Sequence, residues 1–121
     1  MTNSQTRAST AELAESAAQA VRELNHRTRS QDTFTGPADL YRLAAELVLL
    51  VDGLPQLLGQ LAHWLHTEHD AGRLRSDNAT DPGPAVADAT AELADGGAAA
   101  RDLGRVLARA QQHLAHLGAP A

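Results

Sequence analysis

The sequence contains no cysteine and no lysine, and aromatic residues make up only 2% of its 121 positions. Without cysteine, the chain has no disulfide, no thiolate metal ligand and no cysteine nucleophile. Valine, threonine and aromatic residues never occur in runs, which disfavours strands. Hydrophobic residues make up 43% of the chain and are mostly alanine and leucine, which are both good helix formers. The composition therefore predicts a small all-α protein.

The formal net charge is -5, and every one of the basic residues is arginine. This acidic balance disfavours binding to a phosphate backbone as the main activity. No apolar stretch follows the polar N-terminus, so we expect no secretion signal there. The most apolar window, residues 43–65, contains Glu46 and Asp52, and we interpret it as a helix outside the membrane. We therefore expect a cytoplasmic protein without membrane association.

Local patterns predict three helices. Ser9 and Glu12 have the spacing of a capping box, which predicts a helix over about 10–26. Its apolar face is thin, so this helix is marginal alone. We expect residues 1–8 to form a flexible N-terminus and residues 9–121 to form a single helical domain. The predicted apolar face of this first helix consists of Leu13, Ala17, Val21 and Leu24.

The second predicted helix covers about 37–69 and carries a regular heptad pattern. Pro55 lies inside it, but the phase of the pattern is unchanged across the proline, which favours a kinked continuous helix over a turn between two helices. The next positions, Ala44, Val51, Leu58 and Leu65, widen the apolar stripe, as expected in a helical bundle. The heptad positions are Leu40, Leu43, Leu47, Leu50, Leu54, Leu57, Leu61 and Trp64.

The third predicted helix covers about 84–117 and has the same alternating spacing of apolar residues. Two such helices joined by a short polar loop are expected to form a long antiparallel hairpin. Gly96 and Gly97 each cost the helix about 1 kcal/mol relative to alanine. Either close approach of the two helix backbones offsets this cost, or the helix breaks locally at the pair. The predicted pairs, uncertain by a turn or two, include Leu50 with Leu107, Leu54 with Leu103, and Leu61 with Gly96.

The leucine stripe predicts a partner. The first helix reaches only about 24 Å, whereas the stripe extends for about 45 Å, so apolar surface is left over. We expect homodimerisation or binding to another helical protein, which favours a non-catalytic interaction or scaffolding protein. The alternative is a monomeric three-helix bundle with some exposed leucines. The predicted partner-binding residues are Leu47, Leu50, Leu54, Leu57 and Leu61.

Catalytic or metal-binding chemistry is not predicted. His63, His66 and His69 occupy outward heptad positions near a helix C-terminus, where imidazole suits the helix dipole. Carboxylate pairs such as Glu92 and Asp95 are typical of a solvated helix face. We therefore predict no catalytic residue, no metal site, no cofactor and no enzymatic activity. The second hypothesis is a nucleic-acid-associated regulatory protein, which would use the small arginine clusters Arg27, Arg29, Arg73 and Arg75.

The arginine-only, alanine-rich and glycine-rich composition resembles that of small helical proteins from high-GC actinobacteria. This resemblance is one of composition and implies no activity. A hairpin of this length is also similar to the WXG100-like proteins. Trp64 is followed by Leu65 and His66, however, so the Trp-x-Gly turn of that family is missing, and only the hairpin shape is shared.

Overall fold

The computed structural model describes residues 7–78 and 80–120. Within these ranges the chain has no strand, and the predicted all-α fold is confirmed. Two compact units are formed, Met1–Thr35 and Gly36–Ala121, and we describe each by itself. This boundary falls inside the single domain that we expected over 9–121. Of the expected flexible segment 1–8, residues 1–6 lie outside the described residues.

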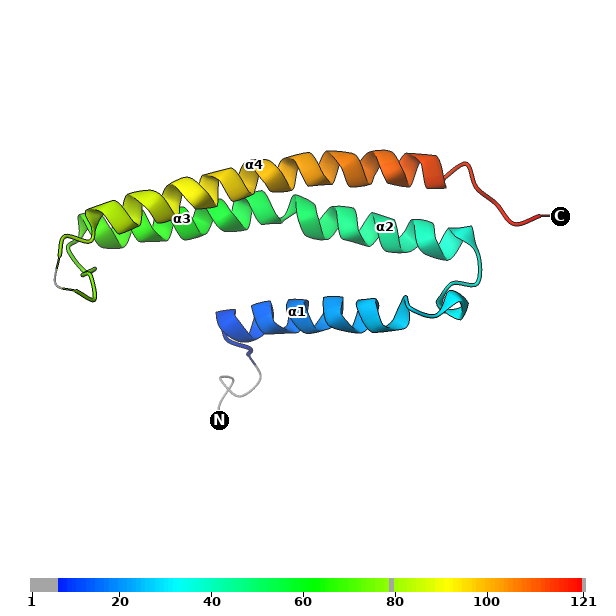
Figure 1. The fold of residues 1–121 in the computed structure, drawn as a ribbon, viewed down its shortest axis with the longest axis horizontal. Coiled ribbons are helices and arrows are strands. Elements are labelled where there is room, and N and C mark those ends of the chain that lie inside the picture. The colour runs from blue at the N-terminus through cyan, green and yellow to red at the C-terminus, as the bar shows by residue number, and fades with distance from the viewer. Residues whose placement is uncertain (1–6, 79, 121) are drawn as a thin grey trace. The chain divides into compact units, whose positions relative to one another are not determined.

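The helices lie close to their predicted positions (Figure 1). The hairpin of the second unit is formed by α2 and α3 on one side and by α4 on the other. The third predicted helix ends about three residues earlier than expected, at Leu114, with Ala115 as its C-cap residue. Beyond Ala115 the hydrogen bonds become shorter, because the N–H groups of His116 and Leu117 donate to the carbonyls three residues before them. The elements are α1 (Thr10–Arg27), the 3-10 helix η2 (Gln31–Thr33), α2 (Pro37–Asp52), α3 (Leu54–Asp70) and α4 (Gly83–Leu114).

Helix α1 begins with the predicted capping box. The Glu12 backbone N–H donates to Ser9 Oγ over 3.1 Å, and the Ser9 backbone N–H donates to Glu12 Oε1 over 2.8 Å. Both bonds satisfy donors that a helix N-terminus leaves free. At the other end, the Thr28 hydroxyl donates to the Leu24 carbonyl over 2.7 Å. No residue of α1 is buried, so local bonds of this kind hold its ends.

The start of α1 is expected to depend on pH. The hydrogen bonds from Ser9 lower the pKa of Glu12 below its ordinary value of 4.5. Their stabilisation is therefore complete above that value and is lost as the pH falls through the lower pKa of the folded chain. We expect the first turn of α1 to fray on acidification, which backbone Cα chemical shifts recorded from about pH 6 to about pH 2 would measure. Glu12→Gln keeps an acceptor but does not titrate, and it should remove this dependence. Unchanged first-turn shifts in the original chain would contradict the prediction.

Helices α2 and α3 are nearly one helix, as predicted. Gly53 alone separates them, and it keeps helical backbone angles of φ -79° and ψ -18°. The Gly53 N–H donates to the carbonyls of Leu49 and Leu50, and its own carbonyl accepts from the Leu57 N–H over 3.2 Å. Because Pro55 has no N–H to donate, the helical ladder is weakened at this point. The joint bends the helix without changing the phase of its apolar residues.

Helix α3 ends in a Schellman motif. The Gly72 N–H donates to the His69 carbonyl, and the Arg73 N–H donates to the Glu68 carbonyl, both over 3.0 Å. This motif requires a left-handed residue, and Gly72 supplies it with a φ of 72°. The turn starts the loop that leads back into α4, so α4 runs antiparallel to α3 and α2.

Small residues form the contact between the two sides of the hairpin. A Cβ placed on Gly97 would lie 3.8 Å from the Pro55 Cα, and one on Gly96 would lie 3.2 Å from Leu58 Cδ1. Helix α4 is unbroken at this glycine pair. Of the two alternatives, the close approach of the two helix backbones is therefore correct, and the local helix break is not. The buried residues of the hairpin are Ala44, Val51, Val86, Gly97, Ala100 and Gly104.

The heptad leucines are not at the centre of this contact, which corrects the predicted seam. The contact follows Ala44, Val51 and Leu58, which come one residue after the leucine positions of the heptad. Gly96 lies against Leu58 instead of Leu61, so the observed register differs from the predicted one by about one helical turn. Leu50 was predicted to pair with Leu107, but its side chain is exposed. The small residues allow the backbones to approach, and the leucines are therefore displaced to the side of the contact.

Candidate interaction face

A row of large apolar side chains on α2 and α3 remains exposed to solvent. The exposed fractions are 46% for Leu50 and for Leu57, 45% for Leu61 and 57% for Trp64. These residues are separated by three, four or seven positions, so they lie on one side of the helix. Helix α4 adds Leu103, of which 48% is exposed. We call these residues, Leu50, Leu57, Leu61, Trp64 and Leu103, the apolar face.

The two helices contribute to the same side of the hairpin. Val51 and Gly104 face each other across the contact, because a Cβ on Gly104 would lie 3.8 Å from Val51 Cγ1. Successive residues are about 100° apart around a helix. In an antiparallel pair, residues that precede the contact positions point to one side, and those that follow point to the other. Leu50 comes one residue before Val51, and Leu103 comes one residue before Gly104, so these two leucines point to the same side of the hairpin.

The opposite side of the hairpin confirms this geometry. Asp52 and Arg105 come one residue after Val51 and Gly104, and both line one groove of about 550 Å³. That groove holds charged side chains beside apolar ones, and Arg105 forms an ion pair with Asp102 next to it. The hairpin therefore has an apolar face on one side and, on the other, a groove with charged residues, which we call the polar groove. The groove is lined by Val48, Asp52, Pro55, Gln56, Arg101, Gly104, Arg105 and Ala108.

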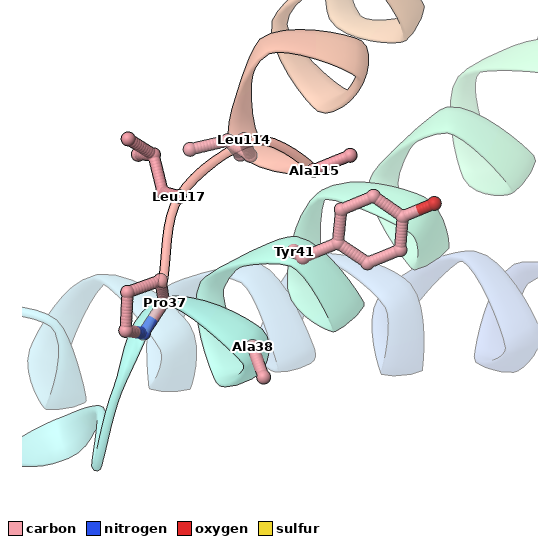
Figure 2. Close-up of a pocket in the computed structure, with 6 residues that line it drawn as sticks. All are labelled: Pro37, Ala38, Tyr41, Leu114, Ala115 and Leu117. Carbon is pink, nitrogen blue, oxygen red and sulfur yellow. The ribbon is translucent and has the colours of Figure 1, made fainter. Parts of the chain in front are cut away.

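A smaller pocket of about 230 Å³ lies at the open end of the hairpin, where α2 begins and α4 ends. Figure 2 shows Tyr41 on α2 beside the end of α4, with Leu114 and Leu117 close to Pro37. All of its lining side chains are apolar except for the Tyr41 hydroxyl, so it offers no set of polar groups that would orient a ligand. The lining residues are Pro37, Ala38, Tyr41, Leu114, Ala115 and Leu117.

The predicted partner-binding leucines divide into two groups. Leu50, Leu57 and Leu61 are exposed on the apolar face. Leu47 and Leu54 are half-buried, because they lie closer to the contact with α4. Sequence reasoning did not include Trp64 and Leu103 among the binding residues, although both stand at heptad positions of their helices. It also missed the contact role of Gly104, whose spacing from Gly97 and Ala100 was the available signal.

The predicted arginine clusters are partly engaged in ion pairs. Arg27 Nε contacts Glu23 Oε2 at 2.9 Å on α1. Arg73 binds both carboxylate oxygens of Glu68, at 2.9 and 2.7 Å, and its hydrogen bonds lower the pKa of that carboxyl. Arg29 and Arg75 are exposed. Arg27 and Arg29 belong to the first unit, whereas Arg73 and Arg75 belong to the second.

The histidines do not form a metal site with the acidic residues around them. Among residues 7–78 and 80–120, no group of three or more histidine or carboxylate side chains is placed to hold a metal ion. His63 and His66 are exposed near the loop end of α3. His113 and His116 flank Leu114, which lies at the open end of the hairpin beside Tyr41.

The segment Pro37–Asp70, which includes α2 and α3, is long and apolar enough to cross a membrane by length and composition alone. Its mean hydropathy reaches 1.2, and 11% of the window is buried. The same segment carries Arg42, Glu46 and Asp52, which are costly inside a bilayer. The expected cytoplasmic location stays a prediction.

No protein-family model matches the chain, and no match was found among curated proteins or among solved structures. The fold and the face together define a class: an all-α protein whose helical hairpin exposes an apolar surface on one side.

Proposed function

We propose that this chain is a non-catalytic interaction or scaffolding protein that associates through its apolar face. A second copy or another helical protein would cover the face. The observation that carries the proposal is the exposure of Leu50, Leu57, Leu61 and Trp64 in one row, with Leu103 on the same side. Contiguous exposed apolar patches of this kind are typical of protein-binding sites, whereas single exposed leucines are ordinary.

The dimensions of the face are consistent with this proposal. From Leu50 to Trp64 the row extends for about 21 Å at 1.5 Å per residue. Two packed helices 8–10 Å apart present a surface about 20 Å wide, so the face covers about 400 Å². A standard protein interface buries about 800 Å² on each partner. The apolar face would therefore form the centre of an interface, and the polar residues around it would form the rim.

Helix α1 offers few apolar side chains of its own. None of its residues is buried, and Leu13 is exposed. The hairpin itself has a thin core, and none of the described side chains is fully buried. Association would thus add the buried surface that a two-helix layer lacks.

The experiment that tests the proposal is a measurement of solution mass by light scattering over a wide range of protein concentration. We expect masses above the 12.7 kDa of one chain, rising toward a fixed multiple as the concentration increases. A constant mass of 12.7 kDa in a helical protein would contradict self-association. Binding to lipid vesicles without self-association would identify the face as a membrane-contacting surface instead.

The nucleic-acid hypothesis gains no support from the arrangement of the arginines. Arg27 and Arg73 already have carboxylate partners within 2.9 Å. Both described hollows that contain arginine also contain a carboxylate, which disfavours a phosphate: Asp52 lies beside Arg101 and Arg105, and Asp77 lies beside Arg75. We therefore keep the interaction function as the single proposal.

A further inference from the structure

A stripe of carboxylates on α4 borders the apolar face. Glu92 comes about three turns before Leu103, so the two side chains point to the same side of the helix. Asp88 and Asp95 stand one turn before and one turn after Glu92, and all three carboxylates are exposed. In the part of the chain that the structure describes, none of the three takes part in an ion pair. We call Asp88, Glu92 and Asp95 the acidic stripe.

The acidic stripe lies level with the exposed apolar residues of α3. Gly96 stands against Leu58, and α4 runs antiparallel to α3. Glu92, one turn before Gly96, is therefore level with Leu61 and Trp64. The axes of two packed helices are about 8–10 Å apart. The apolar row and the acidic stripe thus run side by side, close enough for one bound helix to touch both.

No described arginine on this side of the loop end balances the stripe. Helix α3 contains no arginine. Arg73, in the loop that follows α3, is already bound to Glu68. On α4 itself, Arg101 and Arg105 line the polar groove on the opposite side of the hairpin. The charges of α4 are therefore separated, with carboxylates beside the apolar face and arginines at the polar groove.

This arrangement specifies the chemistry of a partner. Like charges one turn apart on a helix repel each other, and cations placed beside them relieve the repulsion. Amphipathic helices bind to exposed apolar surfaces through residues that repeat every three or four positions. We infer that the occupant of the apolar face is one amphipathic helix of another protein. Its apolar stripe covers Leu61 and Trp64, and the arginine or lysine residues along one flank meet the acidic stripe.

The inference rests on the proposed function and selects one of the two occupants considered there. A second copy of the chain carries the same carboxylates on its own α4 and no arginine on its α3, so it brings no cation to this edge. Like charges that meet in an interface weaken it. The face also covers about 400 Å², half of what a standard interface buries on each partner. Both features favour a single basic helix over a second hairpin.

Trp64 is the only tryptophan of the chain and lies on the apolar face, so its fluorescence reports directly on occupancy. The probes are two synthetic peptides of about 18 residues, long enough to span about 27 Å as helices. Both have the same leucine stripe and no tryptophan, but one carries arginine and the other glutamate along the flank. We expect the arginine peptide to shift the Trp64 emission to shorter wavelength and to bind about tenfold more tightly. This difference should shrink as the salt concentration rises from about 0.05 M to about 0.5 M.

A pair of isosteric variants locates the charge effect. Glu92→Gln together with Asp95→Asn should weaken binding of the arginine peptide by about threefold to tenfold. The matched control, Asp70→Asn with Asp77→Asn, removes the same charge from the end of α3 and from the loop, and it should bind the peptide like the original chain. Circular dichroism checks that both variants remain helical. The peptide comparison and the salt dependence use the original chain, so they do not depend on the folding of a variant.

The outcomes separate this inference from the proposed function. Equal affinity for the two peptides, or equal weakening in both variants, would overturn the role of the acidic stripe and leave the apolar face as a binding surface. An unchanged Trp64 emission with both peptides would overturn the helical partner. If the solution mass still rose to a fixed multiple, self-association would remain, whereas a shift with phosphatidylcholine vesicles alone would identify a lipid surface. A constant single-chain mass, with no shift in any of these mixtures, would overturn both proposals.

Discussion

A chain that carries Leu50→Asp together with Leu57→Asp is expected to remain monomeric at concentrations where the original protein associates. Both leucines are 46% exposed on the apolar face, and neither contributes to the buried contact with α4. Each substitution removes about 1.5–3 kcal/mol of burial that the interface would supply. In a dimer every substitution counts twice, and it also places a charge in an apolar interface. We therefore expect the dissociation constant to rise by at least about 1000-fold.

The matched control shifts both substitutions by one residue, to Leu49→Asp with Gln56→Asp. This variant has the same spacing, but its substitutions lie on other sides of the helix, where Leu49 is 65% exposed and Gln56 lines the polar groove. It should associate like the original chain. Light scattering measures the mass, and circular dichroism shows that all three chains remain helical. Equal loss of association in both variants would show that charge alone, and not the apolar face, is responsible.

Gly97 is expected to tolerate alanine but not leucine. A Cβ at this position lies 3.8 Å from the Pro55 Cα, which is an ordinary contact distance. Gly97→Ala should therefore raise the free energy of unfolding by about 0.8–1 kcal/mol through helix propensity. The larger side chain of Gly97→Leu meets the backbone of α3, and overpacking of this kind costs about 1–3 kcal/mol.

Gly59 provides the control for these two substitutions. It is also a helical glycine, but nothing lies within 4 Å of its Cβ position, so both alanine and leucine should stabilise the chain there. Urea unfolding followed by circular dichroism, at one fixed protein concentration, measures all four variants against the original protein. If Gly97→Leu proves as stable as Gly97→Ala, the hairpin contact is looser than the structure describes.

The sequence predicts most of the helical architecture because its signals are local. The capping box of Ser9 and Glu12, the proline at the start of α2 and the glycine that ends α3 act within a few residues of the chain. The unchanged apolar phase across Pro55 also correctly indicated one bent helix. The end of α4 was predicted about three residues too late, since Leu117 continues the apolar spacing although the α-helical hydrogen bonds end with that of Ala115.

The position of the helix contact was not predictable from the leucines. Large apolar residues give the strongest signal in a sequence, and their heptad pattern placed the contact on Leu50 and Leu57. The closest approach of two helices is decided by the smallest residues, such as Gly97 and Gly104, which carry little hydrophobic signal. Likewise, the sequence indicated Arg73 as a candidate for nucleic-acid binding. The ion pair that engages Arg73 forms because the turn after α3 brings this side chain back to Glu68.

The contact with α4 and the apolar face keep a fixed angle around the helix through Gly53, so one added residue there would turn the apolar row of α3 into the contact. An insertion at Gly53 turns everything that follows by about 100°. Leu57, Leu61 and Trp64 would then rotate into the contact with α4, and the hairpin would still close on large apolar side chains. The outward surface would instead receive Gln56, Gln60 and His63, all polar. A length change of a single residue would thus leave a hairpin that can fold but has lost its means of recognising a partner.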